Sequence, residues 1–198
     1  MLFVKGGRWF IFPSKISNTE DEMKKRELLI IVVSLFFFLL TQSLPAQTWQ
    51  STKRLTWNSG ESRYSAIAIG LSGDIHVTWH DNSPGNFEIY YKRSTDGGTT
   101  WQPTKRLTWN SGNSSYPAIA IDPSRNIHVV WSDDTPGNYE IYYKRSTDGG
   151  ATWTTQRLTW NSGESSYPAI ATDPSGNIHI VWRDNTPGNY EIYYKKGK

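Results

Sequence analysis

Residues 47–198 consist of short apolar or alternating segments separated by clusters of turn residues. Residues 116–121 form an apolar run that ends at an Asp-Pro pair, and residues 126–131 are β-branched and aromatic. Residues 139–144 alternate between apolar and polar side chains, and a turn over residues 146–153 precedes a fourth segment that reaches Leu158. Segments of this length and composition predict β-strands.

This four-strand unit occurs three times along the chain. The sequence Arg-Leu-Thr-Trp starts at residues 54, 106 and 157, with offsets of 52 and 51 residues. Residues 106–145 and 157–196 are identical at 33 of 40 positions, and residues 54–93 match the second copy at 28 of 40. Four short strands in a repeat of roughly 40 to 50 residues are typical of a β-propeller blade. The sequence therefore predicts an all-β fold of three four-stranded antiparallel blades.

The first 46 residues have a different pattern. Three basic residues at 24–26 precede an apolar run over residues 28–40, and Ala46 offers a small residue for cleavage. This order predicts a secretory signal-peptide helix, with the true start at Met23 and a secreted or cell-surface (periplasmic or extracellular) product. The run of 13 residues is short for a membrane span, so an uncleaved anchor is the alternative, and the only expected contact with a membrane.

Composition limits the partners that the chain can take. Without residues 1–46 the net charge falls from +3 to about +1, and no basic stripe is present, so we expect no nucleic-acid partner. The chain has no Cys, so its core must stabilise it without disulfides.

Two octapeptides carry a resemblance to a known family. The pattern S-x-D-x-G-x-x-W is met twice, by Ser94, Asp96, Gly98 and Trp101 and by Ser146, Asp148, Gly150 and Trp153. It resembles the Asp-box (BNR) repeat of sialidases and other secreted propellers. The resemblance implies a structural hairpin between the third and fourth strands of a blade, away from any active site. In such a turn the Asp accepts backbone N–H groups and Gly supplies a positive φ.

The chain ends predict a shared blade. We place the blades at about residues 56–107, 108–158 and 159–198, the last completed by a fourth strand over residues 48–55. Three blades are fewer than the roughly four to eight of closed propellers. A homodimer that closes a six-bladed ring is therefore one expectation, and a fragment of a larger surface propeller is the other.

The candidate binding residues lie in loops expected on one face of the blades. A flat Trp ring and fixed polar groups suit a sugar, so a glycan or a surface protein is the expected partner. The alternative, which the frequency of buried aromatics in β cores favours, is that the Trp residues pack between blades and the Asp residues cap turns. The candidates are Trp57, Asn58, Asp81, Trp109, Asn110, Asp133, Asp134, Trp160, Asn161 and Asp184.

Metal sites and cofactors are not expected. Calcium could use Asp81, Asp133 and Asp184 with the adjacent Asx residues, but one blade offers fewer than the six to eight oxygens it needs. His76, His128 and His179 recur once per blade without the local spacing of a zinc site, so we expect structural roles.

These observations favour a secreted, non-catalytic binding module, with carbohydrate as the candidate ligand. An exo-α-sialidase-like hydrolase and a structural or protein-binding fragment are the alternatives. The resemblance implies that a sialidase needs an arginine triad, a Tyr–Glu nucleophile and an acidic Asp. The family's F/Y-R-I-P motif is missing, and the arginines that do not repeat are Arg63, Arg125 and Arg183. We therefore assign no catalytic residue.

Overall fold

The computed structural model describes residues 3–5, 8–10, 17–40 and 47–198, with side chains for residues 19–33 and 47–198. The chain divides into two compact units, residues 1–53 and residues 54–198. Each unit is described separately.

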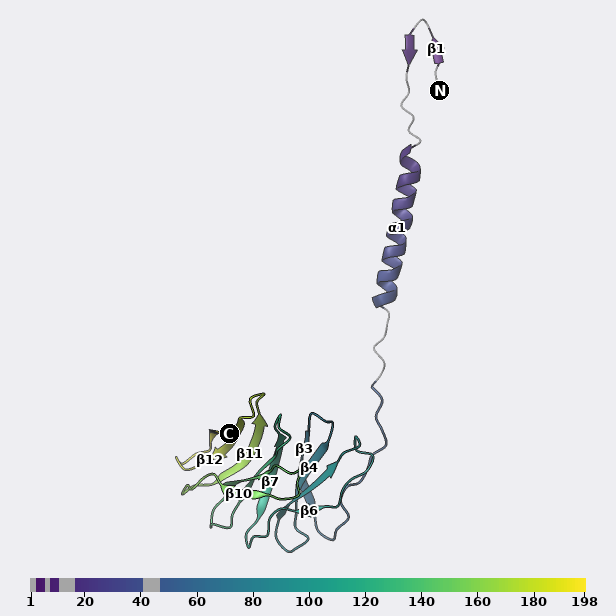
Figure 1. Ribbon diagram of the computed structural model, residues 1–198. Helices are drawn as coiled ribbons and strands as arrows, with labels where there is room; N and C mark the ends of the chain where they lie inside the picture. The colour runs from purple at the N-terminus through teal and green to yellow at the C-terminus, as the bar shows by residue number, and fades with distance from the viewer. Residues whose placement is uncertain (1–2, 6–7, 11–16, 41–46) are drawn as a thin grey trace. The chain divides into compact units, whose positions relative to one another are not determined.

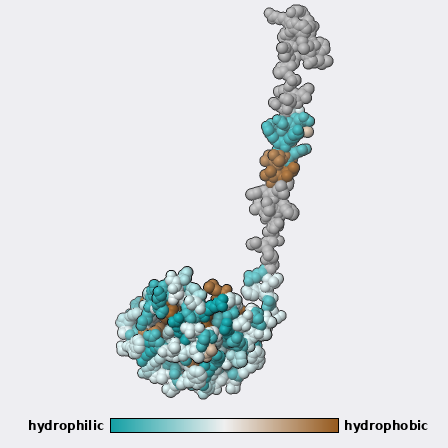
Figure 2. Space-filling view, viewed as in Figure 1, coloured by the Kyte–Doolittle hydropathy of each residue, from teal (hydrophilic) through white to brown (hydrophobic). Residues whose placement is uncertain are grey.

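The first unit contains a small hairpin and one helix. Strands β1 (Phe3–Lys5) and β2 (Arg8–Phe10) pair antiparallel, and α1 spans Ser17–Leu40. Figure 2 shows the described part of α1 changing from hydrophilic to hydrophobic along its length, as the apolar run begins at Leu28. No helix in the described part of the chain has the length and apolar character to cross a membrane. The predicted cleavage point at Ala46 lies outside the described residues, so the signal peptide stays a prediction.

The second unit consists of three antiparallel sheets that lie side by side (Figure 1). In each sheet the strands follow one another in sequence order, which is the meander of a propeller blade. Blade 1 contains β3 (Ser62–Ile69), β4 (Ile75–Asp81), β5 (Glu88–Ser94) and β6 (Lys105–Arg106). Blade 2 contains β7 (Ser114–Ile121), β8 (Ile127–Asp133), β9 (Glu140–Ser146) and β10 (Thr154–Arg157). Blade 3 contains β11 (Ser165–Thr172), β12 (Ile178–Asp184) and β13 (Glu191–Gly197).

The first strand of each blade lies toward a common axis. Strand β7 contacts both β3 and β11, so the three first strands are neighbours in space. Blade 3 has three strands in the structure, and residues 47–57 form no strand. The pairing of residues 48–55 with blade 3 therefore stays a prediction.

The hydrophobic core lies between successive blades. One cluster joins Ile89, Tyr91 and Leu107 of blade 1 to the β8 face of blade 2, and a second joins Ile141 and Leu158 of blade 2 to blade 3. Because the middle sheet is covered on both faces, β8 is buried along its whole length. The structure thus depends on contacts between blades rather than on a core within each blade.

The two Asp-boxes form the turns between the third and fourth strands. The Asp148 carboxylate accepts hydrogen bonds from the Thr152 backbone N–H at 2.9 and 3.0 Å and from the Thr152 hydroxyl at 2.5 Å. These bonds hold the pKa of Asp148 well below its usual range, and the same pattern lowers the pKa of Asp96 to about 2. Gly150 has a φ of +90°, and a Cβ there would lie 3.0 Å from Tyr91 of blade 1. The second box therefore also shapes the contact between blades 1 and 2.

Candidate functional site

The loops expected to share one face do contact each other. The side chain of Asn86, in the β4–β5 loop, donates a hydrogen bond to the carbonyl of Asn110, in the link between blades 1 and 2, at 3.1 Å. Asn138 makes the same bond to Asn161 at 3.0 Å. In blades 1 and 2 the second loop therefore contacts the link that follows the blade.

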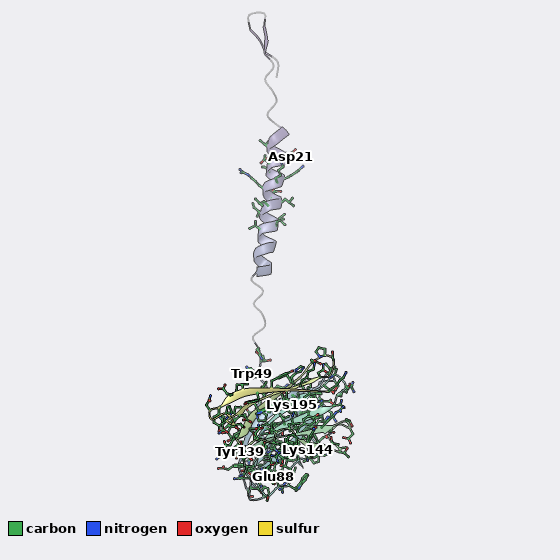
Figure 3. The ribbon with its side chains drawn as sticks, turned by 90° about the vertical axis from the view of Figure 1, so that its left-hand side faces the viewer. Asp21, Trp49, Glu88, Tyr139, Lys144 and Lys195 are labelled. Carbon is green, nitrogen blue, oxygen red and sulfur yellow. The ribbon has the colours of Figure 1, made fainter. Side chains whose placement is uncertain are left out.

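The three repeated tryptophans lie on the surface. Trp57, Trp109 and Trp160 are 68, 66 and 66 % exposed, so the interpretation that they pack between blades is wrong. Each ring has two cations over it: around Trp109 they are Arg106 at 5.8 Å and Lys144 at 5.6 Å from the ring centroid (Lys144 is labelled in Figure 3). The rings are therefore accessible, but their faces already make cation–π contacts.

The aspartates expected to face a ligand are buried instead. Asp81, Asp133 and Asp184 are at most 1 % exposed. The Asp184 carboxylate accepts hydrogen bonds from Asn161 and Ser165, both at 2.5 Å, and from the Thr186 N–H at 2.8 Å. Asp81 and Asp133 have equivalent partners, including Asn58 and Asn110.

These hydrogen bonds lower the pKa of Asp81 and occupy its carboxylate oxygens. Burial alone would raise the pKa of Asp81, but the bonds from Ser62, Ser83 and Asn58 outweigh burial and lower it. Asp134 also has an internal role, because it accepts a hydrogen bond from the Asn113 backbone N–H at 2.5 Å. The Asp and Asn candidates thus tie each blade to its preceding link. Within the described residues, no group of three or more His, Cys, Asp or Glu side chains is placed to hold a metal.

The repeated histidines bind residues of their own blades. The Nδ1 atoms of His76, His128 and His179 lie 2.7 to 2.8 Å from the hydroxyls of Tyr91, Tyr143 and Tyr194. Since each ring sits in a separate blade and has a tyrosine partner, the three do not converge on one ion.

A tyrosine cluster that the sequence did not suggest lies where the first strands meet. It consists of Tyr64, Tyr116 and Tyr167, which have φ of +49°, +56° and +54°. Each occupies the same β-bulge in β3, β7 and β11. The rings of Tyr116 and Tyr167 stack with centroids 4.0 Å apart, and Tyr64 meets Tyr116 edge-on at 4.8 Å. Left-handed backbone at a bulky residue costs about 1–3 kcal/mol, so the bulges hold these rings in place at an energetic cost.

Residues that differ between the blades surround this cluster. The position before the buried Asp holds His80 in blade 1, Ser132 in blade 2 and Arg183 in blade 3. The Arg183 guanidinium lies 4.2 Å from the ring centroids of both Tyr167 and Tyr190. Together with Arg63, which stands where blades 2 and 3 carry Ser115 and Ser166, this position makes the surface chemically different from blade to blade.

A cavity of about 240 Å³ opens beside the cluster; we call it the tyrosine pocket. His80 lies at its wall, 3 % exposed, and stacks on Phe87 with ring centroids 4.4 Å apart. Neither ring nitrogen of His80 has a hydrogen-bond partner among the described residues. Burial and the nearby Arg63 lower the pKa of His80 to about 4, so the ring is neutral at pH 7. The lining residues are Arg63, Tyr64, His80, Phe87, Asn113, Ser115, Tyr116 and Tyr139.

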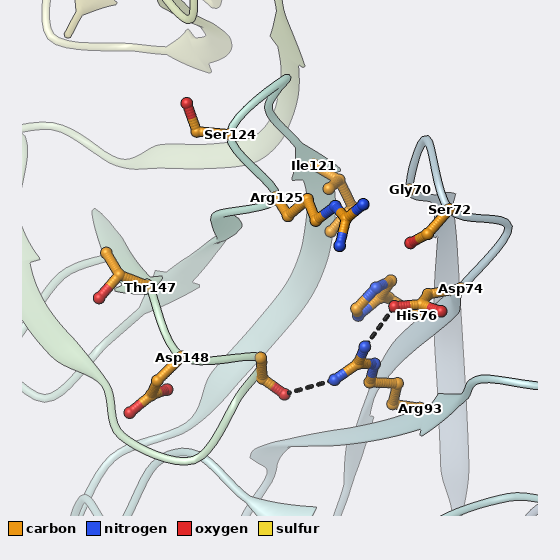
Figure 4. A pocket seen from close by; sticks show the side chains of 11 residues that line it. Gly70, Ser72, Asp74, His76, Arg93, Ile121, Ser124, Arg125, Thr147 and Asp148 are labelled. Atoms are coloured by element: carbon orange, nitrogen blue, oxygen red, sulfur yellow. Dashed lines mark hydrogen bonds and ion pairs between the residues drawn. The ribbon is translucent and has the colours of Figure 1, made fainter.

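A second cavity, of about 290 Å³, lies at the turns of the Asp-box side. Figure 4 shows Arg93 between Asp74, with which it forms an ion pair, and the carbonyl of Gly149, 3.3 Å away. Arg125 extends over Ile121 into the open part of this cavity (Figure 4). Arg93 is therefore bound to the protein on both sides of this cavity.

Comparison with known proteins supports the propeller fold and the assignment of the two Asp-box turns. Residues 82–180, half of the chain, match the BNR repeat-like domain. The chain belongs to this family. The predicted resemblance and the all-β propeller fold are thereby confirmed. No curated protein matches the chain.

Solved propellers resemble this BNR repeat-like chain at low identity. A Hadza microbial sialidase superposes with a TM-score of 0.58 at 17 % identity, over 69 % of this chain and 35 % of its own. An endo-arabinase of Bacteroides thetaiotaomicron gives 0.55 at 18 %, over 76 % and 61 %. The GH93 α-L-arabinofuranosidase of Fusarium graminearum, solved with arabinobiose, gives 0.57 at 17 %, over 68 % and 45 %. The BNR repeat-like chain thus spans between about a third and three fifths of these structures.

Proposed function

We propose that this chain is a secreted, non-catalytic carbohydrate-binding propeller whose ligand site is the tyrosine pocket. The observation that carries the proposal is the buried His80, whose two ring nitrogens have no partner among the described residues and which borders a cavity lined by aromatic rings. A neutral imidazole can accept one hydrogen bond and donate another, as two sugar hydroxyls require. The rings of Tyr64 and Tyr116 supply the flat apolar surface that a sugar ring packs against.

The size and charge of the pocket support a small ligand. About 240 Å³ is below the roughly 300–1,000 Å³ of drug-sized sites, so one or two sugar residues fit better than a long chain. Arg63 at the rim is bound to Glu61 at 2.5 Å, both side chains being more than half exposed. Its charge is therefore partly compensated, and neutral sugars are favoured over strongly acidic ones.

Hydrolysis has less support than binding. The hydroxyl of Tyr190 donates a hydrogen bond to Glu164 at 2.8 Å, which raises the pKa of Tyr190 and keeps its proton in place at pH 7. A glycosidase also needs a carboxylic acid with a raised pKa. In the described part of the chain, every carboxyl group with a shifted pKa is shifted downward. Turnover of fluorogenic sialosides or arabinofuranosides that Glu164→Gln abolishes would replace this proposal with a hydrolase.

A glycan array followed by calorimetry tests the binding proposal. We expect a subset of glycans to bind, with Tyr116→Ala weakening the best one at least tenfold. His80→Ser should also weaken binding, and it installs the residue that blade 2 carries at the equivalent position, so the fold tolerates it. Trp109→Ala is the matched control, because it removes an exposed ring that does not line the pocket and should leave affinity unchanged.

The two remaining outcomes contradict the proposal in different ways. Loss of binding in Trp109→Ala but not in Tyr116→Ala would move the site to the surface tryptophans. Failure to bind any glycan would favour a structural or protein-binding role.

A further inference from the structure

Residues that are buried between blades inside the chain are exposed at its C-terminal face. Ile89 in β5 and Ile141 in β9 are 0 % exposed, whereas the equivalent Ile192 in β13 is 77 % exposed. Tyr91 is buried, whereas its equivalent Tyr194 is exposed. Blade 3 thus presents the same apolar face that blades 1 and 2 use to contact the next blade.

The opposite face of the unit is also uncovered. Ile119 in β7 is buried against blade 1, but its equivalent Ile67 in β3 is 64 % exposed, and Ile69 and Leu71 beside it are exposed as well. The chain therefore carries the two halves of one blade-to-blade interface, one at each end. A face of this kind is expected to be covered by a matching surface.

The segment before blade 1 makes two hydrogen bonds that the segments ending blades 1 and 2 also make. The Lys92 ammonium donates a hydrogen bond to the Leu55 carbonyl at 2.9 Å, as Lys144 does to Leu107. The Arg54 Nε donates to the Thr56 carbonyl at 2.6 Å, and Arg106 and Arg157 make the equivalent bonds at 2.6 Å. Residues 54–57 therefore make the same contacts as the segments that complete blades 1 and 2.

Blade 3 lacks the groups that this segment would supply. In blade 1 the Glu88 carboxylate accepts hydrogen bonds from the Arg106 side chain and the Asn110 N–H, both at 2.8 Å, and Glu140 is bound equivalently in blade 2. The exposed Glu191 of blade 3 accepts a hydrogen bond from Asn189, as Glu88 and Glu140 do from Asn86 and Asn138, but none from an Arg or a link N–H among the described residues. By equivalence its missing donors are Arg54 and the Asn58 N–H.

We propose that a second copy of this chain covers both faces, so that residues 54–57 of each copy complete blade 3 of the other and two copies form one six-bladed ring. Blade number is compatible with this stoichiometry, because two units of three blades give six, within the roughly four to eight of closed rings. The two interfaces are identical by two-fold symmetry around the ring axis. The proposal does not depend on the ligand of the tyrosine pocket.

The mass of the native assembly is the first test. The full chain is expressed with its N-terminal segment, and the mass under native conditions is compared with that of the denatured chain. A ratio of two is expected. A ratio of one, or of three or more, would overturn the closed ring. Ile192→Glu should give a folded monomer at the same concentration, whereas Ser124→Glu, which adds the same charge at an exposed turn, should remain a dimer.

Cross-linking tests which residues meet. Tyr90 pairs with Arg106 in the β5–β6 register, so Tyr193 of one copy should face Arg54 of the other. Because the natural chain has no Cys, Arg54→Cys and Tyr193→Cys each introduce one thiol. A mixture of the two variants should form a covalent dimer that reductant reverses, and each variant alone should not. The absence of a cross-link in a mixture that is dimeric would reject this interface.

Discussion

Replacement of His80 by Ser should make the protein less sensitive to acid. Burial lowers the pKa of His80 to about 4, against 6.5 for an unburied histidine. Between these two values the unfolded chain binds a proton that the folded chain does not, so stability falls as the pH falls below 6.5. From pH 7.5 to pH 5.0 the linkage amounts to about 2 kcal/mol for this one residue.

Urea unfolding at the two pH values, at one protein concentration, measures this effect. The natural chain should lose more free energy of unfolding between pH 7.5 and 5.0 than His80→Ser does, by about 2 kcal/mol. His76, whose pKa is also lowered to about 4 by burial, remains in both proteins, so His80→Ser should still lose some stability. Equal losses in the two proteins would show that folding leaves the proton affinity of His80 unchanged, and the argument from burial would fail.

Two other substitutions test local features. Arg125 has a φ of +67°, and Gly73 and Gly176 occupy the equivalent turns of blades 1 and 3. Arg125→Gly should therefore raise the free energy of unfolding, measured in urea, by about 1 kcal/mol. A lower free energy of unfolding would mean that contacts of the Arg125 side chain outweigh the backbone strain. Trp131 is 1 % exposed and Trp109 is largely exposed, so the two form a matched pair. Trp131→Ala should lower the free energy of unfolding by about 3–5 kcal/mol, and Trp109→Ala by less than about 1 kcal/mol. Similar losses for both would contradict the packing described above.

The strands could be predicted closely because their ends are marked by local turn chemistry. The run predicted at residues 116–121 is strand β7 (Ser114–Ile121), and the one at 139–144 is β9 (Glu140–Ser146). Asp-Pro and Pro-Gly pairs stop the strands wherever they occur, so these boundaries need no tertiary information. The repeat then fixes the number of blades.

The candidate site was harder to predict because it depends on pairing between strands. The bulge that turns Tyr116 toward the axis arises from a register shift between β7 and β8, which no local pattern reveals. Trp109 was misplaced because a Trp at a strand end is more often buried than exposed. One signal was available, because the residue before the buried Asp differs in all three copies, as His80, Ser132 and Arg183.

Three lysines bind carbonyl groups of earlier residues, which affects the order in which the blades can fold during synthesis. Lys92, Lys144 and Lys195 each bind a carbonyl 37 residues earlier, at the segment that ends the preceding blade. The segment that ends blade 1 is paired with β5, and it gains this further bond only when the third strand of blade 2 is present. As the chain leaves the ribosome from its N-terminus, folding runs about one repeat behind translation.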